Sequence, residues 1–240
     1  DIEAIFVDTG LEYPEIREFV KTKENITWLK PEMNFKKVIE KYGYPIISKR
    51  VSRNVSDVQR LGNNCWAIRC FNGEKTGFYD MRRWKFLIDA PFKVSNKCCD
   101  IMKKKPLKQF GKNGKKPIIA TMACESQQRR VDWMKKGCNS FDGEQISKPM
   151  SFWTEQDVLR YIKQSQIPYA SVYGKIIEVN KGSKKNHRLL LETTGEPRTG
   201  CMFCMFGVHL EKEPNKFQRM AITHPKQYNY CMHNLGLKEV

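Results

Sequence analysis

Four of the nine cysteines fall into two close pairs, a pattern that can bind metal. Cys98 and Cys99 are adjacent, and Cys201 and Cys204 follow about a hundred residues later in a C-x-x-C arrangement. Four thiolates can hold one zinc ion or a [4Fe–4S] cluster. Adjacent cysteines point in different directions and suit a single ion poorly, whereas a cubane cluster offers four separate irons. The pattern favours an iron–sulfur cluster, with zinc and metal-free buried thiol pairs as the alternatives.

A lysine follows the first cysteine pair at helical spacing. If a helix begins at Cys99, Lys103 lies one turn further along the same face. A cation at that position can stabilise an anionic cluster or bind a substrate anion, which makes Lys103 a candidate catalytic residue. The alternative is that Lys103, Lys104 and Lys105 form a solvated run of charge, and it applies most to the last two.

A candidate ligand site follows the first predicted strand, residues 2–7. Asp8, Thr9 and Gly10 come directly after this strand. In open α/β sheets, ligands bind beyond the carboxyl ends of the strands. Asp8 could accept hydrogen bonds from a ribose or coordinate Mg²⁺, and Gly10 would let a ligand approach the backbone. A turn followed by a helix cap explains the same three residues equally well.

A candidate anion site follows another predicted strand, residues 117–121. Glu125, Ser126, Arg129 and Arg130 lie where this strand runs into a predicted helix. Helix N-termini bind anions, and arginine offers planar donors to phosphate or sulfate. The alternative is a polar helix start whose arginines are solvated.

The other five cysteines show no pairing pattern. Cys231, near the end of the chain, is a candidate redox nucleophile. We expect most of the others to be buried small hydrophobic residues. The sequence contains no H-E-x-x-H, G-x-G-x-x-G or Walker motif.

The elements that must position these residues alternate between strand and helix. Short apolar runs predict strands at residues 2–7, 26–29 and 117–121, the first of them buried. Capping and periodicity predict helices at residues 14–19, 34–42, 48–61, 81–90, 99–110 and 127–136. This alternation predicts an α/β fold with three layers and a mostly parallel sheet.

Later segments are less regular. A helix is predicted to begin at Thr154, and a strand is predicted at residues 172–179. Two more helices are predicted at residues 215–220 and 226–234, and loops at residues 63–77 and 181–187.

Composition indicates an anionic partner. The 240 residues include 43 Lys and Arg against 26 Asp and Glu, a formal net charge of +17. Nucleic acid, a nucleotide, or a sulfate or phosphate ester would suit this charge, although a solvated basic surface would explain it too. No apolar run is long enough for a membrane span, so no membrane partner is expected. The odd cysteine count and the lack of a signal peptide predict a cytoplasmic protein.

Taken together, these segments resemble the phosphoadenosine phosphosulfate reductase family. The matching pieces are V-D-T-G-L-E-Y-P-E at residues 7–15, C-C-D-I-M-K-K-K-P-L at 98–107, E-S-Q-Q-R-R at 125–130 and T-G-C-M-F-C at 199–204. The double cysteine with the distant C-x-x-C resembles the iron–sulfur form, as in assimilatory adenylyl-sulfate reductases. The resemblance implies an adenine nucleotide α-hydrolase-like fold. It also implies a nucleotide-binding α/β domain at residues 1–180, with an irregular and helical cluster-binding arm at residues 181–240.

The chain departs from the family pattern in two places. The family carries a Ser-Gly-Gly-Lys-Asp-Ser type loop after its first strand, and this sequence has none. Residues 2–7 resemble the family's second strand, so we expect the loop upstream of Asp1. The family's reductases also carry a C-terminal Glu-Cys-Gly-Leu-His motif, whose cysteine attacks the substrate sulfur. Here residues 234–240 read N-L-G-L-K-E-V, and Cys231 lies nearby outside any matching motif.

Three functions remain open at this point. The first is reduction of adenylyl sulfate or its 3′-phosphate form to sulfite, with a thioredoxin-like protein as reductant. The second is an ATP-dependent sulfur transferase, using Mg²⁺ with ATP, that thiolates nucleic acid. The net charge and the missing tail cysteine favour this second function. The third is a non-catalytic nucleic-acid-binding module.

Overall fold

The computed structural model describes residues 2–141, 143, 145–182 and 188–240, and the chain forms two compact units. Unit 1 comprises Asp1–Ala4, Tyr13–Ile26 and Lys108–Thr199. Unit 2 comprises Ile5–Glu12, Thr27–Leu107 and Gly200–Val240. Both units are discontinuous in sequence. The predicted division of the chain at residue 180 stays a prediction.

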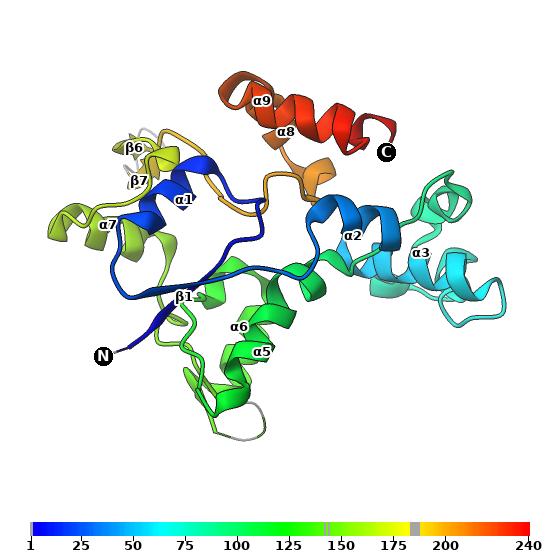
Figure 1. Ribbon diagram of the computed structural model, residues 1–240, viewed down its shortest axis with the longest axis horizontal. Helices are drawn as coiled ribbons and strands as arrows, with labels where there is room; N and C mark the ends of the chain where they lie inside the picture. The colour runs from blue at the N-terminus through cyan, green and yellow to red at the C-terminus, as the bar shows by residue number, and fades with distance from the viewer. Residues whose placement is uncertain (1, 142, 144, 183–187) are drawn as a thin grey trace. The chain divides into compact units, whose positions relative to one another are not determined.

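Strands and helices alternate from β1 to α3, and the rest of the chain is mainly helical up to residue 136 and mixed after it (Figure 1). The α-helices are α1 (Pro14–Lys21), α2 (Phe35–Tyr42), α3 (Lys49–Leu61), α4 (Ile68–Phe71), α5 (Lys105–Phe110), α6 (Gln127–Lys136), α7 (Glu155–Ser165), α8 (Lys216–Thr223) and α9 (Pro225–Asn229). The strands are β1 (Ala4–Val7), β2 (Ile26–Leu29), β3 (Ile46–Ile47), β4 (Asn139–Ser140), β5 (Ile146–Ser147), β6 (Ile176–Asn180), β7 (Leu189–Thr193) and β8 (Met205–Phe206). The structure also contains two short π-helical segments. Asp100–Lys104 leads into α5, and Tyr230–Asn234 follows α9.

Side-chain caps fix where several helices begin, as predicted. The side chain of Asn34 accepts a hydrogen bond from the backbone N–H of Lys37 at 2.9 Å. Ser48 caps α3 in the same way, and Thr154 forms a reciprocal capping box with Asp157 at the start of α7. These side chains satisfy N–H groups that have no partner within the helix. The predicted helices at residues 34–42, 48–61 and 127–136 are confirmed.

The parallel pairing lies mainly in unit 2, around residues 44–47. Strand β3 pairs in parallel with β8, with Ile46 opposite Met205. On the other side, Tyr44 forms a parallel bridge with Val94. Strands β1 and β2 also pair, and the bonds from Ala4 N to Asn25 O and from Asp8 N to Leu29 O advance together along both strands, as parallel strands require. The fold is therefore α/β, as predicted.

Several elements differ from the sequence prediction. The first strand is half-exposed rather than buried, because among the described residues β2 is its one strand partner. The predicted strand at residues 117–121 is reduced to a parallel bridge between Ile118 and Ser147. The strand predicted at residues 172–179 begins later, as β6, and pairs antiparallel with β7. Long-range pairing decides these outcomes, and local sequence does not carry that information.

Two more segments differ in their helical type. Residues 63–77, predicted as a loop, contain the short helix α4. Residues 82–89 form a 3₁₀-helix where an α-helix was expected. The predicted loop at residues 181–187 lies mostly outside the described residues.

The core of unit 2 packs around one face of α3. Val51, Val55 and Val58 lie at helical spacing and are almost fully buried. They pack in one cluster with residues that include Phe71 and Met81. The opposite face of α3 carries its charged side chains, so the core sets which residues this helix presents to solvent. Among the described residues, none of the helices has the length and apolar character needed to cross a membrane.

Gly43 is required for the parallel pairing of residues 44–47, and its replacement tests that pairing. Its φ is +106°, and a Cβ there would lie 2.3 Å from the backbone carbonyl of Lys93. Gly43→Ala should therefore destabilise the protein by at least about 2 kcal/mol more than Gly62→Ala does. Gly62 is the matched control because it also has positive φ but open space around it, so its replacement should cost about 1 kcal/mol. Urea unfolding measures both costs, and equal losses would contradict this role.

Candidate functional site

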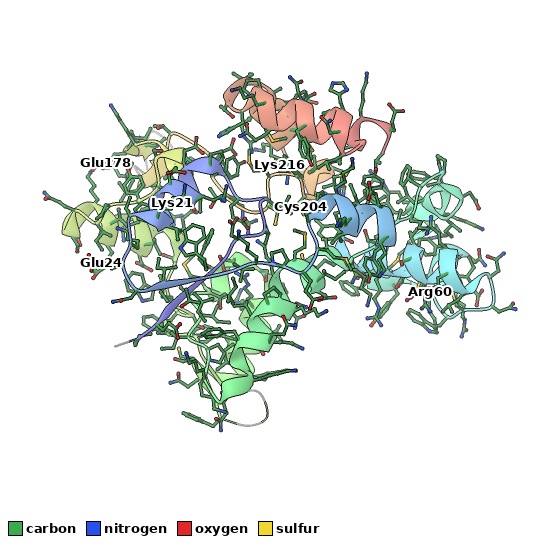
Figure 2. All side chains as sticks on the ribbon, in the orientation of Figure 1. Lys21, Glu24, Arg60, Glu178, Cys204 and Lys216 are labelled. Carbon is green, nitrogen blue, oxygen red and sulfur yellow. The ribbon has the colours of Figure 1, made fainter. Side chains whose placement is uncertain are left out.

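The structure brings the two predicted cysteine pairs together within unit 2. The Sγ atoms of Cys98 and Cys99 lie 4.0 Å apart. The thiols of Cys201 and Cys204 are close enough to act electrostatically on Cys98. Figure 2 labels Cys204 and Lys216, whose side chains also interact electrostatically. These two pairs, about a hundred positions apart in sequence, lie close enough to interact and are together called the thiol cluster below.

The first cysteine pair is positioned by the bridge between Tyr44 and Val94. Ser95 follows this bridge, and its N–H donates to the Tyr44 carbonyl at 2.9 Å. Its hydroxyl then accepts from the N–H of Lys97 at 3.1 Å, and helical geometry begins. Met102 lies one turn after Cys98, is 1% exposed and anchors the segment in the core. The double cysteine therefore sits where an extended segment turns into a helical one.

The two residues between the second pair of cysteines hold the C-x-x-C turn. The N–H of Met202 donates to the carbonyl of Leu11 at 2.7 Å. Phe203 is 5% exposed, and its ring lies near those of Phe35 and Tyr230. Because the middle residues of the turn face the core, the thiols of Cys201 and Cys204 are free to face the first pair.

The thiols shift one another's pKa values, because two negative charges that lie close together and away from water destabilise each other. The hydrogen bond from Cys98 to Cys99 and burial together raise the pKa of Cys98 well above its usual range. The same bond lowers the pKa of Cys99, helped by Lys49 and Lys103. Among the described residues, no three His, Cys, Asp or Glu side chains are arranged to hold a single metal ion. The thiolate favoured at Cys99 is the form that binds metal.

Lys103 lies beside the thiol cluster, at the position predicted one turn after Cys99. Its side chain is half-buried, and burial lowers its pKa. The negative charges of Cys201, Glu12 and Cys99 outweigh burial, so the pKa of Lys103 ends above its usual range. Lys103 is therefore a fixed cation facing the thiols. Lys104, by contrast, is exposed and pairs with Asp100 at 2.8 Å.

Glu12 connects Lys103 to the Asp8–Gly10 turn. Its carboxylate accepts from the N–H of Thr9 at 3.1 Å and from the Thr9 hydroxyl at 2.8 Å. The same carboxylate lies 3.9 Å from Lys103 Nζ. Asp8 and Thr9 are buried, and the N–H of Gly10 donates to Asp8 Oδ1 at 3.2 Å. Glu12 thus connects the predicted ligand turn, through hydrogen bonds, with the predicted catalytic lysine, through an ion pair.

Lys216, at the start of α8, is a second cation that the sequence analysis did not single out. Its Nζ donates to the Cys201 carbonyl at 3.2 Å and faces Cys204 and Cys201. Burial lowers the pKa of Lys216 despite these anions. No motif surrounds it, so no sequence signal could have found it. Glu12 was visible in principle, because Thr9 and Glu12 have the Thr-x-x-Glu spacing of a capping box.

Cys231 is fully buried in the π-helical segment near the end of the chain. Burial raises the pKa of Cys231 to about 12, although nearby Lys216 lowers it. Its thiol is therefore protonated at neutral pH. A buried protonated thiol is a poor nucleophile, and the redox role of Cys231 stays a prediction.

The predicted anion site lies in unit 1, at the N-terminus of α6. Ser126 caps this helix by accepting a hydrogen bond from the N–H of Arg129 at 3.3 Å. Glu125 pairs with Arg129 and accepts from the N–H of Met122 at 3.1 Å. Arg130 is exposed. The arrangement combines a capped helix start with arginine donors, and its role with anions stays a prediction.

Comparison with known proteins identifies the family. The parallel strand pairs and the helices between them place the chain in the α/β class. Residues 54–205, more than half of the chain, match the family model described as phosphoadenosine phosphosulfate reductase domain, so the chain belongs to this family. The family has the adenine nucleotide α-hydrolase-like α/β fold and acts in sulfur metabolism. The match includes the thiol cluster but begins after the Asp8–Gly10 turn. No curated protein matches the chain.

Replacing Glu12 tests whether it holds the turn. Glu12→Ala removes the charged acceptor of two hydrogen bonds from Thr9 and one charge partner of Lys103. Because the Glu12 side chain is 11% exposed, the loss should lower the free energy of unfolding by about 2 kcal/mol. The exposed Glu24→Ala is the control and should change it by less than about 0.5 kcal/mol. Equal effects in a urea titration would show that Glu12 does not hold the turn.

Proposed function

We propose that the thiol cluster binds a [4Fe–4S] cluster through Cys98, Cys99, Cys201 and Cys204, and that the protein reduces a sulfonucleotide. The observation that carries this proposal is the convergence of four thiols beside Lys103, in a chain of this reductase family. The donor set suits the group: four sulfurs, an adjacent pair among them, and lysines to offset the negative charge of an iron–sulfur cluster. When bound, the cluster would supply a fixed electrostatic field next to the substrate anion.

The proposed substrate is adenylyl sulfate or its 3′-phosphorylated form. A thiolate attacks the sulfur, the bond from sulfur to the bridging phosphate oxygen breaks, and AMP or its 3′-phosphate form leaves. A second thiol then attacks the resulting S-sulfonated sulfur, which releases sulfite and leaves a disulfide. The two electrons come from the two thiols. We assign both thiols to a thioredoxin-like reductant, because Cys231 is buried and protonated.

The chain's own residues would bind and orient the substrate. Lys103 would pair with the sulfate group, since its ammonium is fixed near the thiol cluster and carries charge throughout the neutral range. The Asp8–Gly10 turn, held by Glu12, would contact the ribose. Arg129 and Arg130 lie in unit 1, and their role as donors to an anion stays a separate prediction. All nine cysteines are free thiols, which suits a reducing compartment, and we propose a cytoplasmic location.

A sulfur transferase that uses Mg²⁺ and ATP is the competing function, favoured by the net charge of +17. Assays on the same anaerobic preparation separate the two. The reductase should release sulfite from a sulfonucleotide in the presence of a dithiol protein. Pyrophosphate release from ATP that depends on nucleic acid, without any sulfite, would establish the transferase instead.

The metal content provides a direct test of the proposed cofactor. Anaerobically purified protein should be brown, with broad absorbance at about 400 nm and about four irons per chain. Cys98→Ala and Cys201→Ala should each abolish this absorbance, because each removes one ligand. Cys138→Ala is the control, since this thiol belongs to unit 1, and it should keep full iron content. Colourless protein with one zinc per chain, or full iron in Cys98→Ala, would contradict the proposal.

Lys103 is expected to serve the reaction more than the fold. Lys103→Ala should lower kcat/KM for the sulfonucleotide about 100-fold, because it removes a fixed positive charge next to the developing anion. Lys104→Ala, which removes an exposed lysine of the same segment, should leave kcat/KM nearly unchanged. Both variants should unfold at similar temperatures. If Lys103→Ala loses activity only in proportion to its loss of folded protein, the lysine has a structural role.

A further inference from the structure

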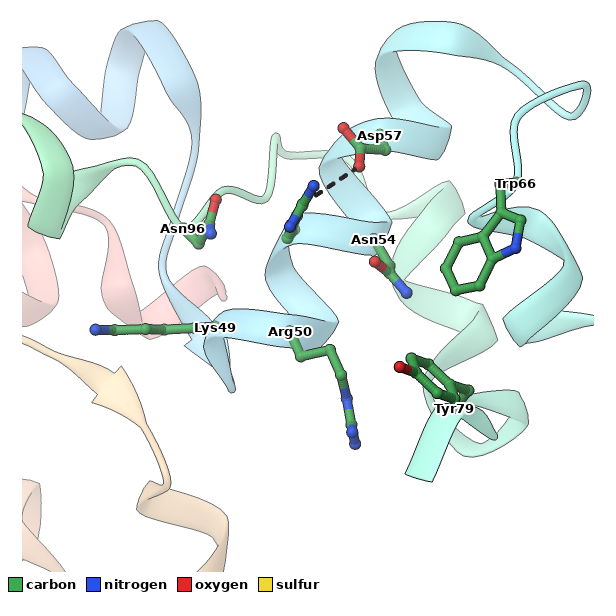
Figure 3. A pocket seen from close by; sticks show the side chains of 8 residues that line it. Lys49, Arg50, Asn54, Asp57, Trp66, Tyr79 and Asn96 are labelled. Atoms are coloured by element: carbon green, nitrogen blue, oxygen red, sulfur yellow. Dashed lines mark ion pairs between the residues drawn. The ribbon is translucent and has the colours of Figure 1, made fainter. Parts of the chain in front are cut away.

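Unit 2 contains a pocket that the proposed reaction does not use. Its volume is about 400 Å³, and it lies between α3 and the segment that contains Trp66 and Tyr79. Lys49, Arg50 and Arg53 of α3 line it. Figure 3 shows the rings of Trp66 and Tyr79 on the side away from Lys49, with Asn54 between them. A volume of this size is at the small end of ligand pockets and can hold the base and sugar of one nucleotide.

Exposed aromatic rings form one wall of this pocket. Trp66 and Tyr79 are about half exposed, at 50% and 48%, and neighbouring Phe78 is 71% exposed. Trp66 and Phe78 each meet Tyr79 edge to face, with ring centroids 5.9 and 5.4 Å away. Three large rings in contact and open to solvent are costly unless a partner covers them. Their faces suit the stacking of planar bases.

The other wall is cationic. Arg50 lies with its guanidinium carbon 3.3 Å from the centroid of the Phe78 ring. Its Nε and Nη1 atoms are buried and lack a hydrogen-bond partner. Asp57 is the acidic group that lines the pocket, and it is neutralised by Arg53 at 3.9 Å and by Arg60 at 3.3 Å. The field inside the pocket is therefore positive, and the exposed side chains of Lys49 and Arg53 offer donors to phosphate oxygens.

We propose that this pocket binds an unpaired base and the flanking phosphates of a single-stranded nucleic acid. Stacking between bases and aromatic side chains, combined with a basic track for the backbone, is the way proteins bind single strands. A duplex would hide the base faces that Trp66 and Tyr79 could stack on. A chain of phosphates fits better than a free nucleotide, because Arg60 continues the row of cations along α3 beyond the pocket.

Lys49 lines the pocket and also acts on the charge of Cys99, so its positive charge influences both the pocket and the thiol cluster. This binding site is independent of sulfonucleotide reduction, because it rests on the aromatic and cationic walls alone.

Fluorescence anisotropy with labelled oligonucleotides tests the proposal on the full chain. A 12-nucleotide single strand should bind, with affinity that falls as salt rises, and RNA and DNA versions show whether a 2′-hydroxyl contributes. Trp66→Leu should weaken binding by about 5- to 100-fold through lost stacking. Arg53→Ala should also weaken binding. It should reduce the slope of the logarithm of the binding constant against the logarithm of salt concentration by about one unit. Arg53 is 73% exposed, so its loss does not threaten folding.

Matched variants in unit 1 serve as controls. Phe152→Leu and Arg160→Ala remove an exposed ring and an exposed arginine and should leave binding unchanged. Wild-type affinity in Trp66→Leu would overturn the proposal, and so would equal losses in the control variants. Equal binding of a duplex, or displacement of the oligonucleotide by millimolar AMP, would overturn it as well. Because sulfite release is measured separately, failure here leaves the proposed reduction standing.

Discussion

Cysteine thiols that lie close together cannot all ionise without repelling one another, and much of unit 2 serves to hold four such thiols near one another. Cys98 and Cys99 touch at 4.0 Å in a partly desolvated setting, where a second negative charge is strongly disfavoured. Three lysines offset this cost, and each comes from a different element. Lys49 lies at the start of α3, Lys103 follows the double cysteine, and Lys216 begins α8. The negative charge of such a group of thiols can be neutralised by a bound cation, by protonation of the thiols, or by these lysines.

The fold brings these groups together through residues 44–47. On one side this segment bridges to Val94, which leads into the first cysteine pair, and on the other β3 pairs with β8, which directly follows the second pair. Residues 44–47 therefore help to position both cysteine pairs of the thiol cluster. Gly43 permits the close approach to Lys93 on which the first half depends. Phe203, buried between the cysteines of the second pair, orients the other half.

Helices could be predicted from the sequence much better than strands, for a physical reason. Asn34, Ser48 and Thr154 cap helices through contacts with residues only three positions away, so local sequence contains the information. Strand pairing joins distant residues, which explains why residues 117–121 do not form the expected strand. At the site, motif spacing revealed the cysteines and Lys103. It did not reveal Lys216, whose role arises only from tertiary packing.

The most direct test of the central claim is chemical cross-linking of the thiols in folded, metal-free protein. A short reagent that joins two sulfurs, followed by peptide mapping with mass spectrometry, reports which cysteines lie within its reach. The account predicts links between the peptide that contains Cys98 and Cys99 and the peptide that contains Cys201 and Cys204, and it predicts that urea abolishes these links. Links confined to each pair, with none between the two peptides, would contradict it.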